Sequence, residues 1–410
     1  MSTAAEPFPE PHTYTRTKLA DLVEFRRGLT YKKKDEVDQS SNAVLRANNI
    51  DLASGQLDLS GIRYIDDAIN VPASKKLEAG SVLLCTASGS RSHLGKAAYI
   101  DTAIDCAFGG FMGLLVPSSR LNGKFLHYFT RSDAYWQFLD GLAGGTNINN
   151  LKFKDLGELA IPLPELEEQK RIVAVLDQAF AALDRARSHC ESNIQSAINL
   201  FRGFLESVLS RDIEEWDQRP LKALGDIQTG STPKSSNKEN FGDFVPFVKP
   251  GNFNADGSLT IGTNGLSEEG AQKARLISAG SAMMVCIGAT IGKAGFNDQQ
   301  IATNQQINSL SPNDSVLGEF LYYQFITERF QKQVRQHAGQ ATLPIVNKSK
   351  WSNLLVPIPP DVDTQLGIVE KLRRMRSHSD CLIEKYEAKL NALTNLRAAL
   401  LRQAFAGEVT

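Results

Sequence analysis

The sequence contains few cysteines and no long apolar run. Its 410 residues include five scattered cysteines without a Cys-x-x-Cys spacing: Cys85, Cys106, Cys190, Cys286 and Cys381. This odd number argues against a zinc site or a disulfide framework and is typical of reduced cysteines in a cytoplasmic protein. No apolar stretch approaches the length of a membrane span, and the first residues do not have the pattern of a secretory signal. We therefore expect a cytoplasmic protein without membrane contact.

A catalytic constellation is also lacking. The run 89–98 resembles a phosphate loop, but five residues instead of four separate Gly89 from Gly95, and Ala97 stands where a magnesium-binding Ser or Thr belongs. Asp361 and Glu387 resemble a nuclease pair, yet both lie in or beside a long helical pattern. We therefore predict a non-catalytic protein that uses no metal and no cofactor.

Strong charge of either sign is absent, since the formal net charge is −1. Phosphate contacts need local positive charge, so this balance argues mildly against a protein that binds nucleic acid alone. Two explanations that permit nucleic-acid binding stay open. Acidic residues elsewhere can offset basic clusters, or partner proteins can supply much of the charge.

What the chain does contain is an internal repeat. The segment "GKFLHYF" that starts at Gly123 corresponds to "GEFLYYQ" at Gly318, and Pro162 corresponds to Pro357, each pair 195 residues apart. A shift held over such a distance indicates two copies of one structural unit. Such a chain suits a partner that is contacted at two places with different chemistry.

Each copy combines a mixed, glycine-rich part with a long helix, which predicts an α+β (mixed α/β) fold. Two similar globular domains would be separated by two long antiparallel helices that form a coiled coil with internal pseudo-two-fold symmetry. We expect a disordered segment at 1–14, a first domain at 15–162, a central helix at 163–212, a second domain at 213–358 and a C-terminal helix at 359–410. Within the domains, the segments 124–142 and 319–334 each have helical spacing.

The long helices are predicted from heptad spacing. Steps of three and four residues from Val173 to Val208 meet apolar residues everywhere except Arg187, and the same steps from Val369 to Ala404 are mostly apolar. A helix of about 45 residues extends roughly 68 Å and cannot bury a one-sided stripe alone. The two helices therefore most simply pack on each other, although two ordinary core helices of larger domains remain an alternative.

A set of polar residues has the chemistry for recognising bases. Arg pairs with guanine and Asn or Gln with adenine in the major groove, whereas lysines hold phosphates. The candidate DNA contacts are Arg46, Asn48, Arg91, Lys96, Lys249, Asn252, Lys293, Asn304, Gln305 and Gln306. Turn-forming amides and solvated lysines are the competing interpretation. The copies differ most at "FGGFM" (108–112) and "TNQQI" (303–307), so we expect Asn304→Ala to relax sequence choice in one half-site only.

Several segments resemble the DNA specificity subunit of Type I restriction-modification systems. They are "IPLPELEEQKRIVAVLD" at 161–177, the closing helix "LRAALLRQAFAGEV" at 396–409, and the paired elements "LGKAAYI" and "IGKAGF". The resemblance covers nearly the whole chain and includes the duplicated order of elements.

The resemblance implies two target recognition domains, each recognising one half of a bipartite, asymmetric site on double-stranded DNA. It also implies helices that bind two methylation subunits, with a restriction subunit joining the full complex. Glu168, Gln169 and Gln365 are the expected partner-interface residues, with Thr364 in the place of Glu168 in the second copy. A coiled-coil scaffold that binds only proteins is the alternative, favoured by the near-neutral charge.

Overall fold

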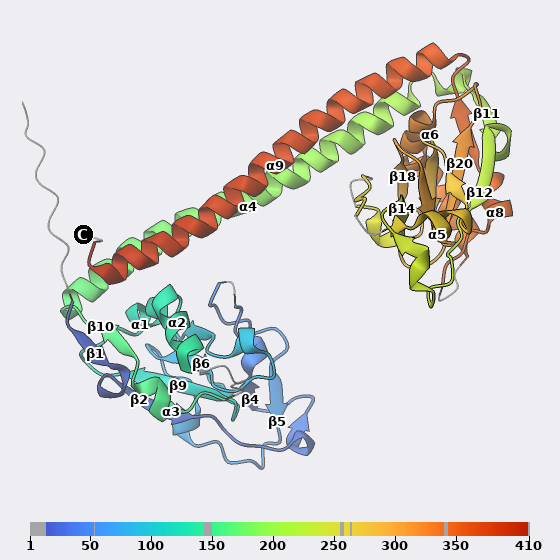
Figure 1. Cartoon of the computed structure of the whole chain (residues 1–410). Helices are drawn as coiled ribbons and strands as arrows, with labels where there is room; N and C mark the ends of the chain where they lie inside the picture. Colours follow the sequence, from blue (N-terminus) through green and yellow to red (C-terminus); the bar gives the residue numbers. More distant parts are fainter. Residues whose placement is uncertain are drawn as a thin grey trace, which may run out of the picture. The chain divides into compact units, whose positions relative to one another are not determined.

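The computed structural model describes residues 14–52, 54–142, 150–254, 258–262, 265–339 and 343–408. Its contacts divide the chain into two compact units (Figure 1). Unit 1 comprises residues 1–189 and 389–410, and unit 2 comprises residues 190–388. Among the described helices, none has both the length and the hydropathy needed to cross a bilayer. The segment predicted to be disordered lies outside the described residues except for Tyr14, whose hydroxyl donates to the Glu168 carboxylate at 3.4 Å.

The domain of unit 1 contains two four-stranded sheets in its described part. The first has the order β2-β9-β6-β7, and the second has the order β3-β5-β4-β8. All neighbours are antiparallel except β4 and β8, which are parallel. The bounds are β2 (Val23–Arg27), β3 (Glu36–Val37), β4 (Asn42–Leu45), β5 (Arg63–Ile65), β6 (Val82–Cys85), β7 (Ala97–Tyr99), β8 (Ala107–Phe108) and β9 (Met112–Pro117), with β1 (Arg16–Lys18) paired to β10 (Ala160–Pro162).

The domain of unit 2 repeats this topology, with one additional strand, β16, at the edge of its second sheet. Its sheets have the orders β12-β20-β17-β18 and β13-β15-β14-β19-β16, and β14 and β19 are again parallel. The bounds are β12 (Gly225–Thr229), β13 (Phe241–Gly242), β14 (Val245–Val248), β15 (Gly265–Leu266), β16 (Leu276–Ile277), β17 (Ala282–Val285), β18 (Ala294–Phe296), β19 (Ile301–Thr303) and β20 (Ile307–Pro312), with β11 (Asp217–Pro220) paired to β21 (Leu355–Ile358). The predicted repeat and the predicted α+β class are confirmed.

Strand β6 shows why these strands are continuous apolar runs. Successive side chains point to opposite faces of a strand, and both faces of β6 are covered. Val82 and Leu84 pack in the cluster that contains the helices, whereas Leu83 and Cys85 pack in the cluster shared with the second sheet. A strand buried on both faces has no polar alternation, which is the pattern that the sequence shows.

Each helix predicted after the last sheet strand is in fact two helices. Hydroxyl groups end the first of each pair, because Ser132 Oγ donates to the Phe129 carbonyl at 2.7 Å and Thr327 Oγ1 donates to the Gln324 carbonyl at 2.7 Å. Such local hydrogen bonds compete with helix continuation. The α-helices of the two domains are α1 (Gly123–Phe129), α2 (Asp133–Leu142), α3 (Phe153–Gly157), α5 (Glu268–Gln272), α6 (Gly318–Phe325), α7 (Glu328–Ala338) and α8 (Lys348–Ser352). Short 3-10 turns are η1 (Leu19–Asp21), η2 (Lys33–Asp35), η3 (Ala47–Asn49), η4 (Ala73–Lys75), η5 (Arg91–His93), η6 (Ile213–Glu215), η7 (Leu221–Ala223), η8 (Lys238–Asn240) and η9 (Pro250–Asn252).

The two long helices are α4 (Leu166–Ser210) and α9 (Val362–Ala406), of 45 residues each. In unit 1 the beginning of α4 packs beside the end of α9. Arg397 lies over the Phe180 ring at 4.5 Å and donates to Asp184 Oδ1 at 2.6 Å. The predicted length and the predicted pairing of the helices are confirmed within this unit.

In unit 2 the end of α4 packs beside the beginning of α9. Ser379 Oγ donates to the Ala197 carbonyl at 2.9 Å, and Arg376 lies over the Phe201 ring at 4.9 Å. Beyond Phe201 the buried positions are Leu205 and Leu209 rather than the predicted Phe204 and Val208. The stripe shifts by one residue because this end of α4 packs on the domain as well as on α9.

A buried glutamine fixes the first turn of each long helix to its own domain. Gln169 Oε1 accepts the Asn122 N–H at 2.8 Å, and its Nε2 donates to the Arg120 and Pro164 carbonyls, both at 2.9 Å. Gln365 does the same in unit 2 through Leu317 N–H at 2.9 Å and the Ser315 carbonyl at 3.1 Å.

These placements correct the expected partner contact of the two glutamines. Both side chains are 0% exposed, so they offer no surface to a partner in this structure. Their hydrogen-bonding groups are engaged inside their own units, which gives them a structural task. Glu168 differs, because it is only half-buried and pairs with Arg171 at 2.7 Å. Its partner contact stays a prediction.

An ion pair also joins a helix of each domain to the long helix beside it, with the charges exchanged between the two units. In unit 1, Lys124 of α1 pairs with Asp177 of α4 at 2.8 Å. In unit 2, Arg373 of α9 donates from Nε to both carboxylate oxygens of Glu319 on α6, at 2.7 and 2.9 Å. The two junctions therefore have the same geometry but exchanged charges.

We predict that Gln169→Leu destabilises unit 1 by about 3 kcal/mol, because it leaves a buried N–H and two buried carbonyls without partners. Urea unfolding of the full chain, followed by tryptophan fluorescence, measures the change. The control is Lys170→Met at the exposed neighbour, which should cost under about 0.5 kcal/mol. Equal unfolding midpoints for the two variants would contradict the structural task of Gln169.

Candidate nucleic-acid interface

In each unit the candidate interface lies at the carboxyl ends of two parallel strands. In unit 1, β4 leads into the turn η3 and β8 leads into residues 109–111, which we call corner 1. Gly109 N–H donates to the Leu45 carbonyl at 2.9 Å, so the turn and the corner are adjacent. In unit 2, β14 leads into η9 and β19 leads into residues 304–306, called corner 2, where Asn304 N–H donates to the Val248 carbonyl at 3.3 Å.

An asparagine closes each turn. Asn49 Oδ1 accepts the Arg46 N–H at 2.9 Å, while its Nδ2 donates to the Asp58 carbonyl at 2.9 Å. Asn252 Oδ1 accepts the Lys249 N–H at 2.7 Å, while its Nδ2 donates to the Thr260 carbonyl at 2.9 Å. Both ends of the Asn252 amide are thus engaged within the domain. Asn252 holds the turn, and the turn-forming interpretation fits it better than a base contact.

A lysine supports each turn from inside. Lys96 Nζ donates to the Ile50 carbonyl and Lys293 Nζ donates to the Phe253 carbonyl, both at 2.8 Å. Each acceptor is the first residue after its turn. Lys96 is 5% exposed, and burial lowers the pKa of its ammonium group. The structure therefore corrects the expectation for Lys96, whose buried ammonium group holds backbone rather than facing solvent or phosphate. Lys293 is only half-buried, so its phosphate contact stays a prediction.

The turns present other side chains outward. Asn48 and Lys249 are exposed. Arg46 is half-buried, its Nη1 lies 4.0 Å from the Glu36 carboxylate, and its buried Nε has no hydrogen-bond partner among the described residues. The predicted DNA contacts of Arg46, Asn48 and Lys249 are compatible with these positions and stay predictions.

Of the three amide side chains in corner 2, only one is exposed rather than half-buried. Asn304 Nδ2 donates to Gln306 Oε1 at 2.9 Å, and Gln306 N–H donates to Asn304 Oδ1 at 3.1 Å, so these two residues brace each other. Gln305 is exposed, and its Oε1 accepts a hydrogen bond from Thr232 Oγ1 at 2.7 Å. The Gln305 side chain is therefore the best placed of the three to contact a base.

A third segment, missed by the sequence reasoning, lies beside each corner. It follows β2 as Gly28-x-Thr30-x-Lys32 and β12 as Gly230-x-Thr232-x-Lys234. A Cβ on Gly28 would lie 1.9 Å from the Gly109 carbonyl oxygen, and one on Gly230 would lie 2.3 Å from the Asn304 carbonyl oxygen. Only glycine permits this approach. The signal was present in the sequence, but these motifs are 202 rather than 195 residues apart, so one fixed register hides it.

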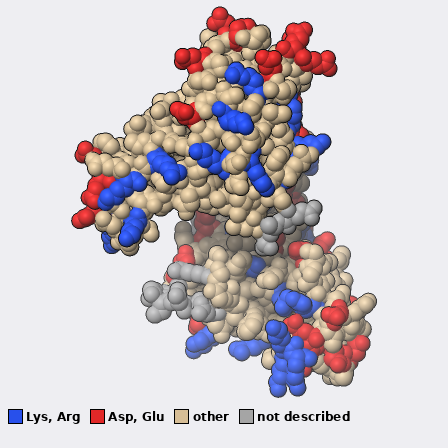
Figure 2. Space-filling model, turned by 90° about the vertical axis from the view of Figure 1, so that its right-hand side faces the viewer, with Lys and Arg blue, Asp and Glu red and all other residues tan. Residues whose placement is uncertain are grey.

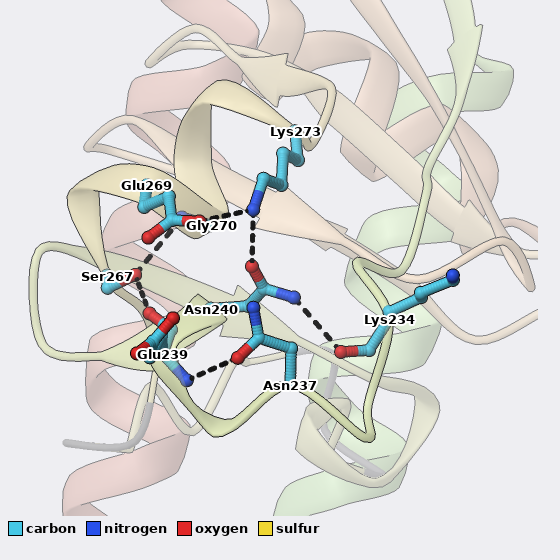
Figure 3. A network of polar contacts seen from close by, with 8 residues as sticks. All are labelled: Lys234, Asn237, Glu239, Asn240, Ser267, Glu269, Gly270 and Lys273. Atoms are coloured by element: carbon cyan, nitrogen blue, oxygen red, sulfur yellow. Dashed lines mark hydrogen bonds and ion pairs between the residues drawn. The ribbon is translucent and has the colours of Figure 1, made fainter.

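A polar network anchors this segment in unit 2 (Figure 3). Asn240 Nδ2 donates to the Lys234 carbonyl at 3.0 Å, and Lys273 Nζ donates to Asn240 Oδ1 at 3.1 Å. Figure 3 shows the Lys234 side chain directed away from this network. The backbone of Lys234 is thus fixed, while its exposed ammonium group is available to an anion such as a phosphate.

Positive charge on the surface is local. Figure 2 shows one face of the molecule, on which Lys and Arg side chains form small groups among Asp and Glu. Lys32, Lys33 and Lys34 are consecutive exposed cations at the end of the segment that begins at Gly28. The side chain of Arg91 lies outside what the structure describes. Within the described ranges, no three His, Cys, Asp or Glu side chains gather as a metal site.

Comparison with known proteins identifies the family of both units. Residues 11–189 and 213–392 each match the Type I restriction modification DNA specificity domain. The StySPI specificity subunit of a Type I restriction enzyme from Salmonella potsdam is 25% identical over 98% of this chain and 90% of its own length. The EcoKI specificity subunit from Escherichia coli K12 is 30% identical over 47% of this chain and 41% of its own length.

Solved structures share the fold. A structure from work on complex assembly and conformational transition of the type I R-M system has a TM-score of 0.77 at 20% identity, covering 98% of this chain and 100% of that one. The HsdS subunit from Thermoanaerobacter tengcongensis has a TM-score of 0.57 at 20% identity, covering 98% of this chain and 99% of that one.

The internal lysines can be separated from the outward ones by chemical labelling. We predict that an N-hydroxysuccinimide ester acetylates Lys96 on the order of tenfold or more slowly than Lys32 or Lys234, because Lys96 reacts only when its surroundings open. Peptide mass spectrometry of the intact folded chain measures the rates, and the urea-unfolded chain is the control. Equal rates in the folded chain would refute the internal placement of Lys96.

Proposed function

Because the chain belongs to the Type I restriction modification DNA specificity family, as a specificity subunit, we propose that each unit recognises one half of a bipartite, asymmetric site on double-stranded DNA. Specificity subunits are DNA-recognition subunits and not catalytic ones. Corner 1 and corner 2 would face the major groove, each together with the turn and the lysine-bearing segment beside it. A subunit with this task works in the cytoplasm, where the DNA is.

One observation carries this proposal. The two units share the parallel strand pair, the asparagine-closed turn and the lysine support, but their corners differ completely in chemistry. Corner 2 has three amide side chains, whereas corner 1 consists of Gly109, Gly110 and Phe111. One backbone frame with two different sets of contact groups is what two different half-sites require.

The proposed contacts divide into two kinds. Arg46, Asn48 and Gln305 have the side chains that pair with base edges. Lys32, Lys234 and Lys249 are exposed cations beside them, suited to phosphates, which set the orientation of a protein on DNA without specifying sequence. Arg91 stays a proposed contact on the grounds of its sequence position alone.

The outer faces of α4 and α9 are the proposed docking surface for two methylation subunits, with Glu168 at the start of α4. Large apolar side chains on these helices are exposed, among them Leu200 at 57%, Leu396 at 47% and Leu382 at 41%. These side chains are apolar surface that a docked partner subunit would cover. In the full complex a restriction subunit would join this assembly.

The proposed function is tested by mapping methylated bases in cells with long-read sequencing. The cells carry the methylation subunit with this chain, or the methylation subunit alone. We expect one split motif that disappears when this chain is deleted. An unchanged methylation pattern, together with retained binding to the methylation subunit, would instead support a scaffold that binds only proteins.

Gln305→Ala tests the assignment of corner 2. We predict that the variant accepts any base at one position of one half-site, with discrimination there reduced by about 1–3 kcal/mol, while the other half-site is unchanged. The same methylation map measures this. Gln300→Ala is the matched control, because Gln300 is an exposed glutamine at the opposite end of β19. Loss of all methylation by the Gln305 variant, with folding intact, would contradict a contact confined to one position.

A further inference from the structure

Phe111 of corner 1 is an apolar side chain in a polar place. Its exposure of 73% is the largest among the large apolar side chains of the described residues. A single exposed apolar residue is ordinary on protein surfaces. The position of Phe111 makes it informative, because this residue belongs to the corner that we assign to base contact in unit 1.

The backbone beneath the ring is fixed. The Phe111 carbonyl accepts three hydrogen bonds, from Thr86 N–H at 2.9 Å, Ala87 N–H at 3.1 Å and Thr86 Oγ1 at 3.0 Å. The exposed ring is therefore attached to an anchored strand end. A side chain that stands on such a support loses little conformational freedom when it binds.

Residues of the candidate interface lie beside the two glycines that precede Phe111. A Cβ on Gly109 would lie 3.8 Å from Arg46 Cγ, and one on Gly110 would lie 3.3 Å from Thr30 Oγ1. Thr30 leads into the exposed lysines that begin at Lys32. Corner 1 thus lies between a proposed base contact and proposed phosphate contacts, and DNA that touched both sides would cover it.

The two corners show what corner 1 is able to recognise. Gly109, Gly110 and Phe111 correspond to Asn304, Gln305 and Gln306, each 195 residues later. Corner 1 therefore has no side chain that forms a hydrogen bond. In the major groove, the apolar feature that distinguishes one base from the others is the 5-methyl group of thymine, and phenylalanine is among the side chains that contact it.

We propose that Phe111 recognises a thymine in the half-site of unit 1, by packing its ring against the 5-methyl group of that base. The proposal rests on the proposed function and adds the chemical identity of one base in one half-site. The contact is apolar, so it selects thymine by burying one methyl group.

The test combines a change in the protein with a change in the DNA. First, the methylation map defines the split motif, and the half-site left unchanged by Gln305→Ala is assigned to unit 1. Duplexes that carry the motif are then made with each thymine of this half-site replaced by uracil, which removes only the methyl group. Binding is measured with the complex of the full chain and its methylation subunits, for the original chain and for Phe111→Ala and Phe111→Leu.

We expect uracil at one position to weaken binding of the original chain about fourfold, the factor for burying one methyl group. Phe111→Ala should weaken binding to thymine DNA by a similar factor and show no further loss on uracil DNA, because both changes remove the same contact. Phe111→Leu should retain part of the discrimination. Phe244→Ala is the control and should bind as the original chain does, since Phe244 is 61% exposed in unit 2, outside both corners.

Three results would overturn the proposal. They are a unit 1 half-site without thymine, full thymine preference retained by Phe111→Ala, and losses from Phe111→Ala and uracil that add independently. The last result would mean that the ring acts elsewhere, for example as a wedge between base steps. Failure of the proposed function has a different signature, because then the original chain defines no motif at all. Unchanged thermal unfolding of Phe111→Ala confirms that the variant is folded.

Discussion

The proposed recognition surface of each unit depends on a parallel strand pair whose two ends are held together. The strands bring a turn and a corner side by side, and a lysine inside the domain then fixes the turn through the carbonyl that follows it. A buried ammonium group such as that of Lys96 is costly unless it is hydrogen-bonded. The contacts of Lys96 and of the half-buried Lys293 tie each turn to the loop-strand element, and the outward side chains gain fixed positions.

On this common frame the two units differ in the chemistry of the corners that we propose to contact DNA. Corner 2 is polar and braced by its own amides, whereas corner 1 is made of glycine and one exposed aromatic ring. The junctions with the long helices show the same principle, because Lys124–Asp177 in unit 1 is matched by Glu319–Arg373 in unit 2 with the charges exchanged. The two units therefore share the arrangement of their backbone, while the side chains at the corners and at the helix junctions differ in chemistry.

Most of the fold could be predicted from the sequence. The periodic spacing of apolar residues indicates which faces are buried, the repeated order of segments indicates two copies of one unit, and both patterns extend over many residues. Single polar residues were less predictable. In the sequence, Gln169 and Lys96 cannot be told apart from surface glutamines and lysines. Only their hydrogen bonds to distant backbone show that they are internal. At the break after Phe129, the hydroxyl groups of Thr130 and Ser132 donate to carbonyls of the last turn of α1, which a helical spacing pattern does not register.

The sequence by itself determined the duplication, the α+β class, the two long helices and the family resemblance. Many residues contribute to each of these patterns, so no single residue decides them. The tertiary structure decided which polar residues face outward. It separated Gln305 from its bracing neighbours, bonded Lys293 to the backbone carbonyl that follows the turn η9, and placed Gly109 beside Arg46 and Gly110 beside Thr30. The physical reason is that exposure depends on contacts between segments tens to hundreds of residues apart, and no local pattern encodes those contacts.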